Sequence, residues 1–225
     1  MPEWRGRFEA FLFDMDGVLT DSMPNHWEAW QKVFADLGVI VDREEILRRE
    51  GEKGMVTLKS VLERSGVRTS PEVLAQALER KEHLFRSFPK PALLPGAREL
   101  VHELWQSGAR VALVTGTSLN EARSNLPADL FEKFDTVVTG DQIDHGKPDP
   151  EPYQVALERL GVQKTRALVI ENAPFGIASA KGAGLTCIAL TTSLPAAELA
   201  GADWVATSLH ELREILLGVP RPNVR

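Results

Sequence analysis

The chain has 225 residues, which corresponds to one or two ordinary domains and is long enough to bury a substantial hydrophobic core. Hydrophobic residues make up 43% of it and charged residues 26%, a composition that excludes collagen, long disorder and low-complexity repeats. The formal net charge of -6 opposes binding to nucleic acid or to an anionic membrane, so we expect neither as a partner.

The first short apolar run, residues 10–13, predicts a buried strand. The next comparable run begins at residue 111, whereas a crossover between parallel strands needs only about a dozen residues. A helical pattern over residues 96–107 supplies the crossover and leaves a long segment unexplained. We therefore expect a helical cap domain at residues 23–89, inserted into a core domain made of residues 1–22 and 90–225.

Within this inserted segment, apolar residues recur at helical spacing. Trp27, Trp30 and Phe34 indicate a first helix, and Ser70 followed by Pro71 is typical of the start of a later one. Three prolines lie between residues 88 and 95, where the chain returns to the core. They predict a stiff hinge at the border of the cap.

Five apolar runs follow the insertion, at residues 111–114, 136–138, 167–170, 186–190 and 204–206. Helical patterns separate the later runs. These patterns end at Gly161 and Gly184, and glycine is common where helices end. Alternating strands and helices predict an α/β fold with a doubly wound, Rossmann-like parallel sheet.

Ligands of such sheets bind beyond the carboxyl ends of the strands. Polar residues gather there: Asp14 and Asp16 after the first strand, Thr115, Gly116 and Thr117 after the second, Lys147 after the third, and Glu171 and Asn172 after the fourth. Buried carboxylates need a cation, and oxygen ligands without a His or Cys cluster favour Mg²⁺ over zinc. A metal, a hydroxyl beside backbone N–H groups and a lysine together predict a site for a phosphoryl group.

These segments resemble the motifs of the haloacid dehalogenase (HAD) superfamily, in its β-phosphoglucomutase-like branch, where a helical cap follows the first motif. Residues 13–18 (Phe-Asp-Met-Asp-Gly-Val) are similar to the first motif and residues 114–117 (Val-Thr-Gly-Thr) to the second. Residues 146–150 resemble the third and residues 170–177 the fourth. The resemblance covers essentially the whole chain.

The resemblance implies a Mg²⁺-dependent phosphohydrolase that acts on a small phosphate ester through an aspartyl-phosphate intermediate. Asp14 would attack phosphorus, and Asp16 would protonate the leaving oxygen and then activate water. The phosphoryl group would be bound by Thr115, Gly116, Thr117 and Lys147, and the metal by Asp14, Asp16, Glu171 and Asn172. Taken singly, each of these residues also has an ordinary explanation as a helix cap, turn or loop residue.

The fourth motif departs from the family at Asn172, where the family usually has aspartate. Asparagine offers a carbonyl oxygen but no charge, so we expect weak Mg²⁺ binding unless another carboxylate contributes. Glu50 is the candidate, because it lies in a glycine-flanked cap loop. Further candidates for cap or substrate contacts are Ser22, His26, Lys53 and Lys81.

Other functions stay open on the sequence alone. The same core motifs serve a β-phosphoglucomutase-type sugar-phosphate mutase and an inorganic pyrophosphatase-like enzyme. A non-catalytic binding protein of this fold is suggested only by Asn172. A phospho-receiver domain has a similar residue set, but its phosphorylated aspartate does not end the first strand, and it has no use for a cap.

The expected partner is a phosphorylated small molecule, and the expected oligomeric state is a monomer or weak dimer. Cys187 is the single cysteine and cannot form an internal disulfide, which suits a reducing compartment. The early apolar run is too short for a signal sequence. We therefore expect a cytoplasmic protein.

Overall fold

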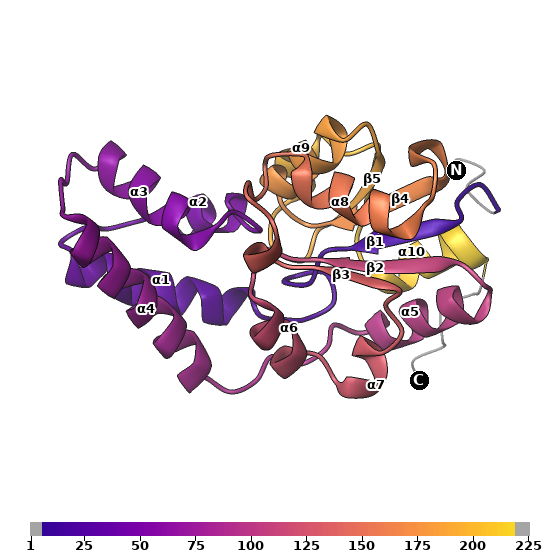
Figure 1. Cartoon of the computed structure of the whole chain (residues 1–225), viewed down its shortest axis with the longest axis horizontal. Coiled ribbons are helices and arrows are strands. Elements are labelled where there is room, and N and C mark those ends of the chain that lie inside the picture. The colour runs from indigo at the N-terminus through magenta and orange to yellow at the C-terminus, as the bar shows by residue number, and fades with distance from the viewer. Residues whose placement is uncertain (1–5, 219–225) are drawn as a thin grey trace.

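The computed structural model describes residues 6–218 and contains a six-stranded parallel sheet with helices on both faces (Figure 1). The strands are β1 (Ala10–Phe13), β2 (Arg110–Val114), β3 (Thr136–Val138), β4 (Ala167–Glu171), β5 (Thr186–Leu190) and β6 (Trp204–Ala206). Their order across the sheet is β3-β2-β1-β4-β5-β6. The order reverses between β1 and β4, which is where a doubly wound sheet opens a crevice for ligands. The predicted Rossmann-like α/β fold is confirmed.

Strand β1 lies at the centre of the sheet, between β2 and β4, and all of its residues are buried. Phe11 and Phe13 contribute to the apolar cluster on one face, and Ala10 and Leu12 to the cluster on the other. Because side chains alternate along a strand, this short apolar run supplies both faces of the core at once.

Helices of the core cover both clusters. They are α5 (Ala97–Gln106), α6 (Leu119–Asn125), α7 (Ala128–Phe131), α8 (Glu151–Leu160), α9 (Pro174–Gly182) and α10 (Leu209–Leu217), with 3₁₀ turns η1 (Gly140–Gln142), η2 (Lys164–Arg166) and η3 (Ala196–Leu199). Helices α5 and α10 supply leucines to the first cluster, and α8 and α9 pack on the second. Gly161 ends α8 with a φ of 66°, as predicted for a left-handed helix end.

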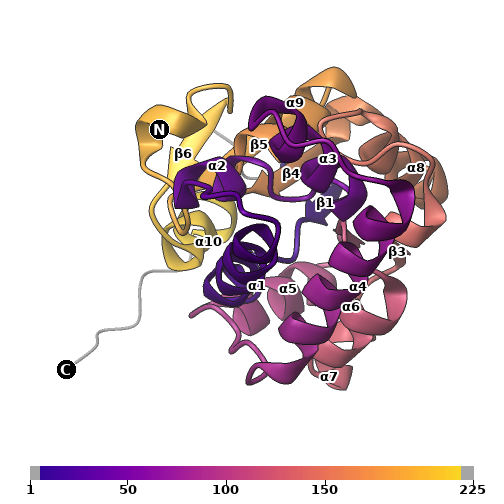
Figure 2. The same ribbon diagram turned by 90° about the vertical axis from the view of Figure 1, so that its left-hand side faces the viewer.

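Four further helices lie beyond the carboxyl ends of the strands, in front of the sheet in Figure 2. They are α1 (Met23–Asp36), α2 (Arg43–Arg48), α3 (Gly54–Arg64) and α4 (Pro71–Ser87). Trp30, Phe34 and Leu58 belong to a third apolar cluster that these helices form among themselves. The predicted cap of α4 is confirmed, since the Ser70 hydroxyl accepts a hydrogen bond from the Val73 N–H at 3.4 Å. We propose that these helices form a cap domain over residues 23–89.

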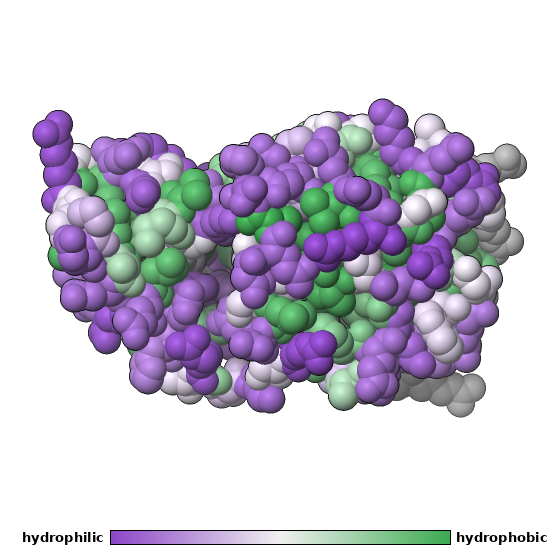
Figure 3. All heavy atoms as spheres, viewed as in Figure 1, coloured by the Kyte–Doolittle hydropathy of each residue, from purple (hydrophilic) through white to green (hydrophobic). Residues whose placement is uncertain are grey.

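Two parts of the predicted core, residues 1–5 and 219–225, lie outside the described residues. Over residues 6–218, no helix is both long and apolar enough to cross a membrane. The face in Figure 3 is largely hydrophilic, with apolar patches on both the cap helices and the core.

Candidate active site

Both acidic residues of the first motif are buried at the end of β1. Asp14 is 1% exposed and Asp16 2%. The Asp14 N–H donates to the Ile170 carbonyl at 3.0 Å and so continues the pairing of β1 with β4 by one residue. Gly17 then turns the chain with a φ of 81°, and a side chain there would clash with Asn172. Glycine is needed at this position for both its backbone conformation and its lack of a Cβ.

A buried lysine lies between two carboxylates. Lys147 Nζ is 2.5 Å from Asp14 Oδ1 and 2.7 Å from Glu171 Oε1, and it also donates to the Val114 carbonyl at 3.2 Å. Burial alone would lower the pKa of Lys147, but Asp14 and Glu171 raise it above its usual value. Lys147 therefore remains a cation, which suits a group that neutralises phosphoryl oxygens.

The nucleophile candidate sits in a strongly acidic environment. Burial, with smaller contributions from Glu171 and Asp16, raises the pKa of Asp14, although Lys147 counteracts this effect. Lys147 is thus insufficient as the sole counterion for these carboxylates. A further cation beside Asp14 would stabilise the ionised form that a nucleophile requires.

Both oxygens of Glu171 are engaged by protein donors. Oε1 accepts from Lys147 and from the Tyr153 hydroxyl at 2.8 Å, and Oε2 accepts from the Asn172 N–H at 2.9 Å. A Cβ at Gly176 would clash with this carboxylate, so the glycine in α9 makes room for it. Tyr153 is a site residue that the sequence did not predict. A tyrosine hydroxyl needs a hydrogen-bond partner when it is buried. A tyrosine among the apolar residues of a helix is therefore the feature of the sequence that could have indicated a polar partner in the core.

Two buried oxygens at this end of β1 and β4 lack partners. Asp14 Oδ2 and Asn172 Oδ1 make no hydrogen bond with any residue in the described part of the chain. Asn172 Nδ2 donates to Ser193 Oγ at 3.0 Å, which leaves the carbonyl oxygen as the free end of the amide. Ser193 is a second residue that the sequence reading missed. Buried oxygens without donors are what a divalent cation would satisfy, so these residues fit Mg²⁺.

The second motif forms a tight turn after β2. Thr115 is buried, and its Oγ1 accepts a hydrogen bond from the Thr117 N–H at 3.2 Å. The Thr117 hydroxyl donates to Glu121 at 2.5 Å. Gly116 faces the cap, because a Cβ there would lie 2.7 Å from the Gly51 carbonyl oxygen. The phosphate-binding candidates of the core therefore lie directly beneath a loop of the cap.

Asp16 is held by residues from the start of α1. The Ser22 hydroxyl donates to Asp16 Oδ1 at 2.5 Å, instead of capping the helix that it precedes. His26 Nε2 lies 3.4 Å from the same oxygen. Burial alone would raise the pKa of Asp16, but His26 and Ser22 hold it below its usual value. The ionised form is the one that activates water, whereas protonation of the leaving oxygen requires Asp16 to carry a proton at the start of the reaction.

His26 is shared between α1 and α4. Its Nδ1 lies 3.2 Å from Lys81 Nζ, and its ring stacks on Phe85 with centroids 4.2 Å apart. Burial, and then Lys81, lower the pKa of His26 and so favour the neutral ring. A neutral ring that accepts from Lys81 presents its other nitrogen, as N–H, to Asp16.

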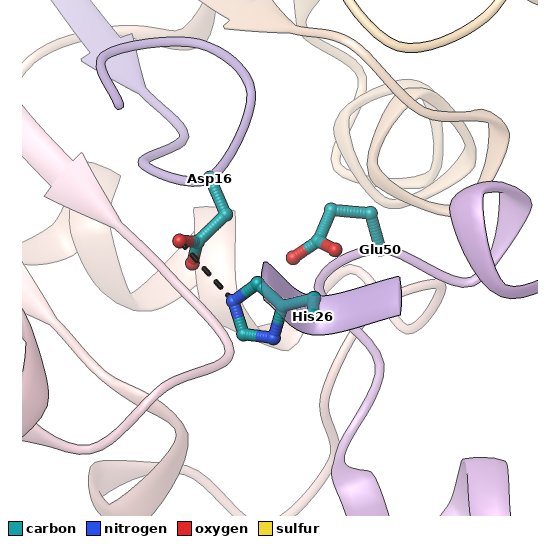
Figure 4. Close-up of side chains that lie close together, drawn as sticks. All are labelled: Asp16, His26 and Glu50. Carbon is teal, nitrogen blue, oxygen red and sulfur yellow. Dashed lines mark ion pairs between the residues drawn. The ribbon is translucent and has the colours of Figure 1, made fainter. Parts of the chain in front are cut away.

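The cap loop after α2 lies on the core. Lys53 Nζ donates to the Ile143 carbonyl at 2.6 Å, and a Cβ at Gly51 would clash with the Lys147 side chain. Asp16, His26 and Glu50 each have one side-chain atom able to ligate a metal, a carboxylate oxygen or a ring nitrogen, and these atoms all lie within 4.8 Å of one another. Figure 4 shows the three side chains turned toward a common point. Of the candidate cap contacts, Ser22, His26, Glu50 and Lys81 therefore converge near Asp16, whereas the Lys53 ammonium bonds the core backbone.

A cavity of about 320 Å³ lies between this loop and the turns after β2 and β3. Its lining includes Asp16, His26, Glu50, Lys81 and Thr117. The cavity therefore borders the carboxylate of Asp16 and is enclosed largely by residues of the cap.

Comparison with known proteins gives consistent matches. Residues 11–190 match the family model described as "Haloacid dehalogenase-like hydrolase". The validoxylamine A 7'-phosphate phosphatase of Streptomyces hygroscopicus is 34% identical over 212 residues, 92% of this chain and 96% of that protein. The phosphorylated carbohydrates phosphatase of Thermotoga maritima is 35% identical over 179 residues, 79% of this chain and 82% of that protein.

A solved structure agrees over a similar extent. CbbY from Rhodobacter sphaeroides, in complex with phosphate, superposes with a TM-score of 0.77 at 33% identity. The superposition covers 91% of this chain and 96% of that one. The resemblance thus extends to the cap helices as well as to the sheet.

Proposed function

This chain belongs to the haloacid dehalogenase-like hydrolase family, in its β-phosphoglucomutase-like branch, and is a phosphatase; from this premise we propose how its own residues perform the reaction. Asp14 attacks the phosphorus of a phosphate monoester and becomes phosphorylated, and water then releases orthophosphate. One observation supports this role above others. Asp14 is buried with Oδ1 held by Lys147, while Oδ2 has no hydrogen-bond partner in the described chain.

Asp16 is proposed to move the proton. It lies two residues from Asp14, and its carboxylate borders the cavity in which the leaving group must sit. It gives a proton to the leaving oxygen in the first half of the reaction and takes one from water in the second. Ser22 and His26, both near Oδ1, orient the carboxylate for this exchange.

The phosphoryl oxygens are proposed to bind Thr115, the N–H groups of Gly116 and Thr117, and the ammonium of Lys147. Hydrolases of this family generally use Mg²⁺. In this chain we assign the ion to the group Asp14, Asp16, Glu171 and Asn172. When bound, Mg²⁺ supplies positive charge to a phosphoryl group in transfer. The unpartnered Oδ1 of Asn172 favours Asn172 as a direct ligand, while Glu171 contributes its charge from behind Lys147.

Asn172→Asp is expected to tighten Mg²⁺ binding by about 10-fold or more, because a charged oxygen replaces a neutral one at similar volume. Ser193 donates a hydrogen bond as readily as it accepts one, so it can still orient the new carboxylate. Calorimetric titration with Mg²⁺ measures the affinity directly. The matched control is Asn120→Asp, which adds the same charge at an exposed position. Unchanged or weaker Mg²⁺ binding in the Asn172 variant would remove Asn172 from the ligand set.

The substrate class is proposed to be small sugar or polyol monophosphates. The relatives named above are phosphatases of phosphorylated carbohydrates and of a validoxylamine phosphate, and the cavity beside Asp16 has room for a compact leaving group. We expect orthophosphate release from sugar and polyol phosphates when a panel of phosphate esters is assayed with Mg²⁺. Isomerisation of β-glucose 1-phosphate in the presence of its bisphosphate would support a mutase, and release confined to pyrophosphate a pyrophosphatase.

We also propose a cytoplasmic location and a monomer or weak dimer. The only cysteine of the chain, Cys187, is buried in β5, and burial raises the pKa of its thiol, so the thiol is unreactive. A single buried thiol suits a reducing compartment. Sedimentation over a range of concentrations measures the oligomeric state.

A further inference from the structure

The cap places a carboxylate where the leaving group of the substrate must lie. Asp16 is proposed to protonate the leaving oxygen, so the rest of the leaving group extends into the cavity beside Asp16. Glu50 lines that cavity and points toward Asp16 and His26 (Figure 4). A carboxylate oxygen of Asp16, a ring nitrogen of His26 and a carboxylate oxygen of Glu50 lie within 4.8 Å of one another. A leaving group bound at Asp16 therefore meets Glu50.

Glu50 differs from the other charged residues of the cavity in having its carboxylate uncommitted. Arg49 is paired with Glu52 at 2.8 Å, and Lys53 donates to a backbone carbonyl of the core. Glu121 accepts from the Thr117 hydroxyl. By contrast, the Glu50 side chain makes no hydrogen bond or salt bridge with the described residues. It remains available for a ligand.

Lys81 lines the same cavity as Glu50, and its ammonium already has partners. Its ammonium contacts His26 Nδ1 at 3.2 Å and lies over the rings of Trp30 and Phe85, at 5.5 Å and 5.2 Å from their centroids. One lysine, Lys81, thus lines the part of the cavity that holds the two carboxylates of Asp16 and Glu50.

Two carboxylates, those of Asp16 and Glu50, face this part of the cavity, with oxygens within 4.8 Å of each other. A ligand anion placed there would meet like charge. A hydroxyl or ammonium group facing Glu50 would instead donate a hydrogen bond to its carboxylate.

We propose that Glu50 selects the leaving group of the phosphatase reaction. Phosphate esters that present a hydroxyl or an ammonium group to Glu50 are accepted, and those that present a carboxylate or a second phosphate are rejected. This inference rests on the proposed hydrolysis of small phosphate monoesters and adds the charge class of the substrate. The selection works by attraction of a donor and by repulsion of an anion at one position.

Three two-carbon esters isolate the effect, because they differ only in the group opposite the phosphate: 2-hydroxyethyl phosphate, phosphoethanolamine and 2-phosphoglycolate. In the natural enzyme, kcat/KM for the hydroxyl and ammonium esters should exceed that for the carboxylate ester by about 10-fold or more. Glu50→Gln should reduce this ratio by about 10-fold. Glu50→Lys should reverse the preference, with the carboxylate ester favoured over the ammonium ester.

The ratio between esters is the readout, since it cancels any general loss of activity in a variant. Glu63→Gln removes the same charge from an exposed position on α3 and is the matched control; its ratio should equal that of the natural enzyme.

The inference is overturned if the natural enzyme prefers 2-phosphoglycolate, or if Glu50→Gln leaves the ratio unchanged. An unchanged ratio with weaker Mg²⁺ binding in Glu50→Gln would place Glu50 with the metal instead. Absence of hydrolysis of every ester, p-nitrophenyl phosphate included, would refute the proposed function itself.

Discussion

Replacing Asp14 with asparagine is expected to reduce phosphatase turnover on the order of 10³-fold or more while the protein stays folded. The amide has nearly the same shape as the carboxylate, but it cannot attack phosphorus, and it leaves Lys147 with Glu171 as its remaining carboxylate partner. Orthophosphate release measures turnover, and circular dichroism measures the fold. Acid quenching during turnover with a radiolabelled substrate should trap a phosphorylated natural enzyme and leave the variant unlabelled.

The matched control for this change is Asp21→Asn, which removes a carboxylate from the same connection at an exposed position. It should retain turnover close to that of the natural enzyme. Substantial activity in the Asp14 variant, or labelling equal to that of the natural enzyme, would show that another group is the nucleophile.

Replacing Asp16 with asparagine is expected to lower the rate by about 10² to 10⁴-fold, with the larger losses for alkyl phosphates. An alkoxide is a poor leaving group and needs the proton that Asp16 supplies, whereas an activated aryl oxide leaves without one. The amide can still accept from the Ser22 hydroxyl, so the local structure should persist. Parallel assays on an alkyl and a nitrophenyl phosphate give the comparison. Equal losses for the two esters would argue that Asp16 acts in some other way.

The fold could be predicted from the sequence because its elements are encoded locally. The run at residues 10–13 is apolar at every position, which is typical of a strand buried on both faces. The Ser70-Pro71 pair marks a helix start in the same local manner. The positions of Asp14, Asp16 and Lys147 followed from the rule that ligands bind at strand ends.

The contacts that tune the site could not be predicted in this way. Tyr153 bonds Glu171 and Ser193 bonds Asn172, and in both cases the partners come from different elements. Such pairs depend on the packing of helices against the sheet, which no local pattern specifies. The hydrogen bonds of the candidate metal ligands could not be predicted either. Glu171 and Asn172 are adjacent in sequence, but both oxygens of Glu171 accept hydrogen bonds from protein donors, whereas the side-chain oxygen of Asn172 accepts none.

Two neighbouring residues of the cap loop differ in what they tolerate. Gly51 approaches Gly116 and Lys147 so closely that it has no room for a side chain, whereas Glu50 has no such contact. A methyl group at Gly51 would strike the lysine, and one at Gly116 would strike the loop backbone. The side chain of the preceding residue, Glu50, faces the cavity and is subject to no such restriction. Exchange of the Glu50 side chain would therefore alter the substrate preference proposed above without disturbing the glycine contact that seats the cap on the core.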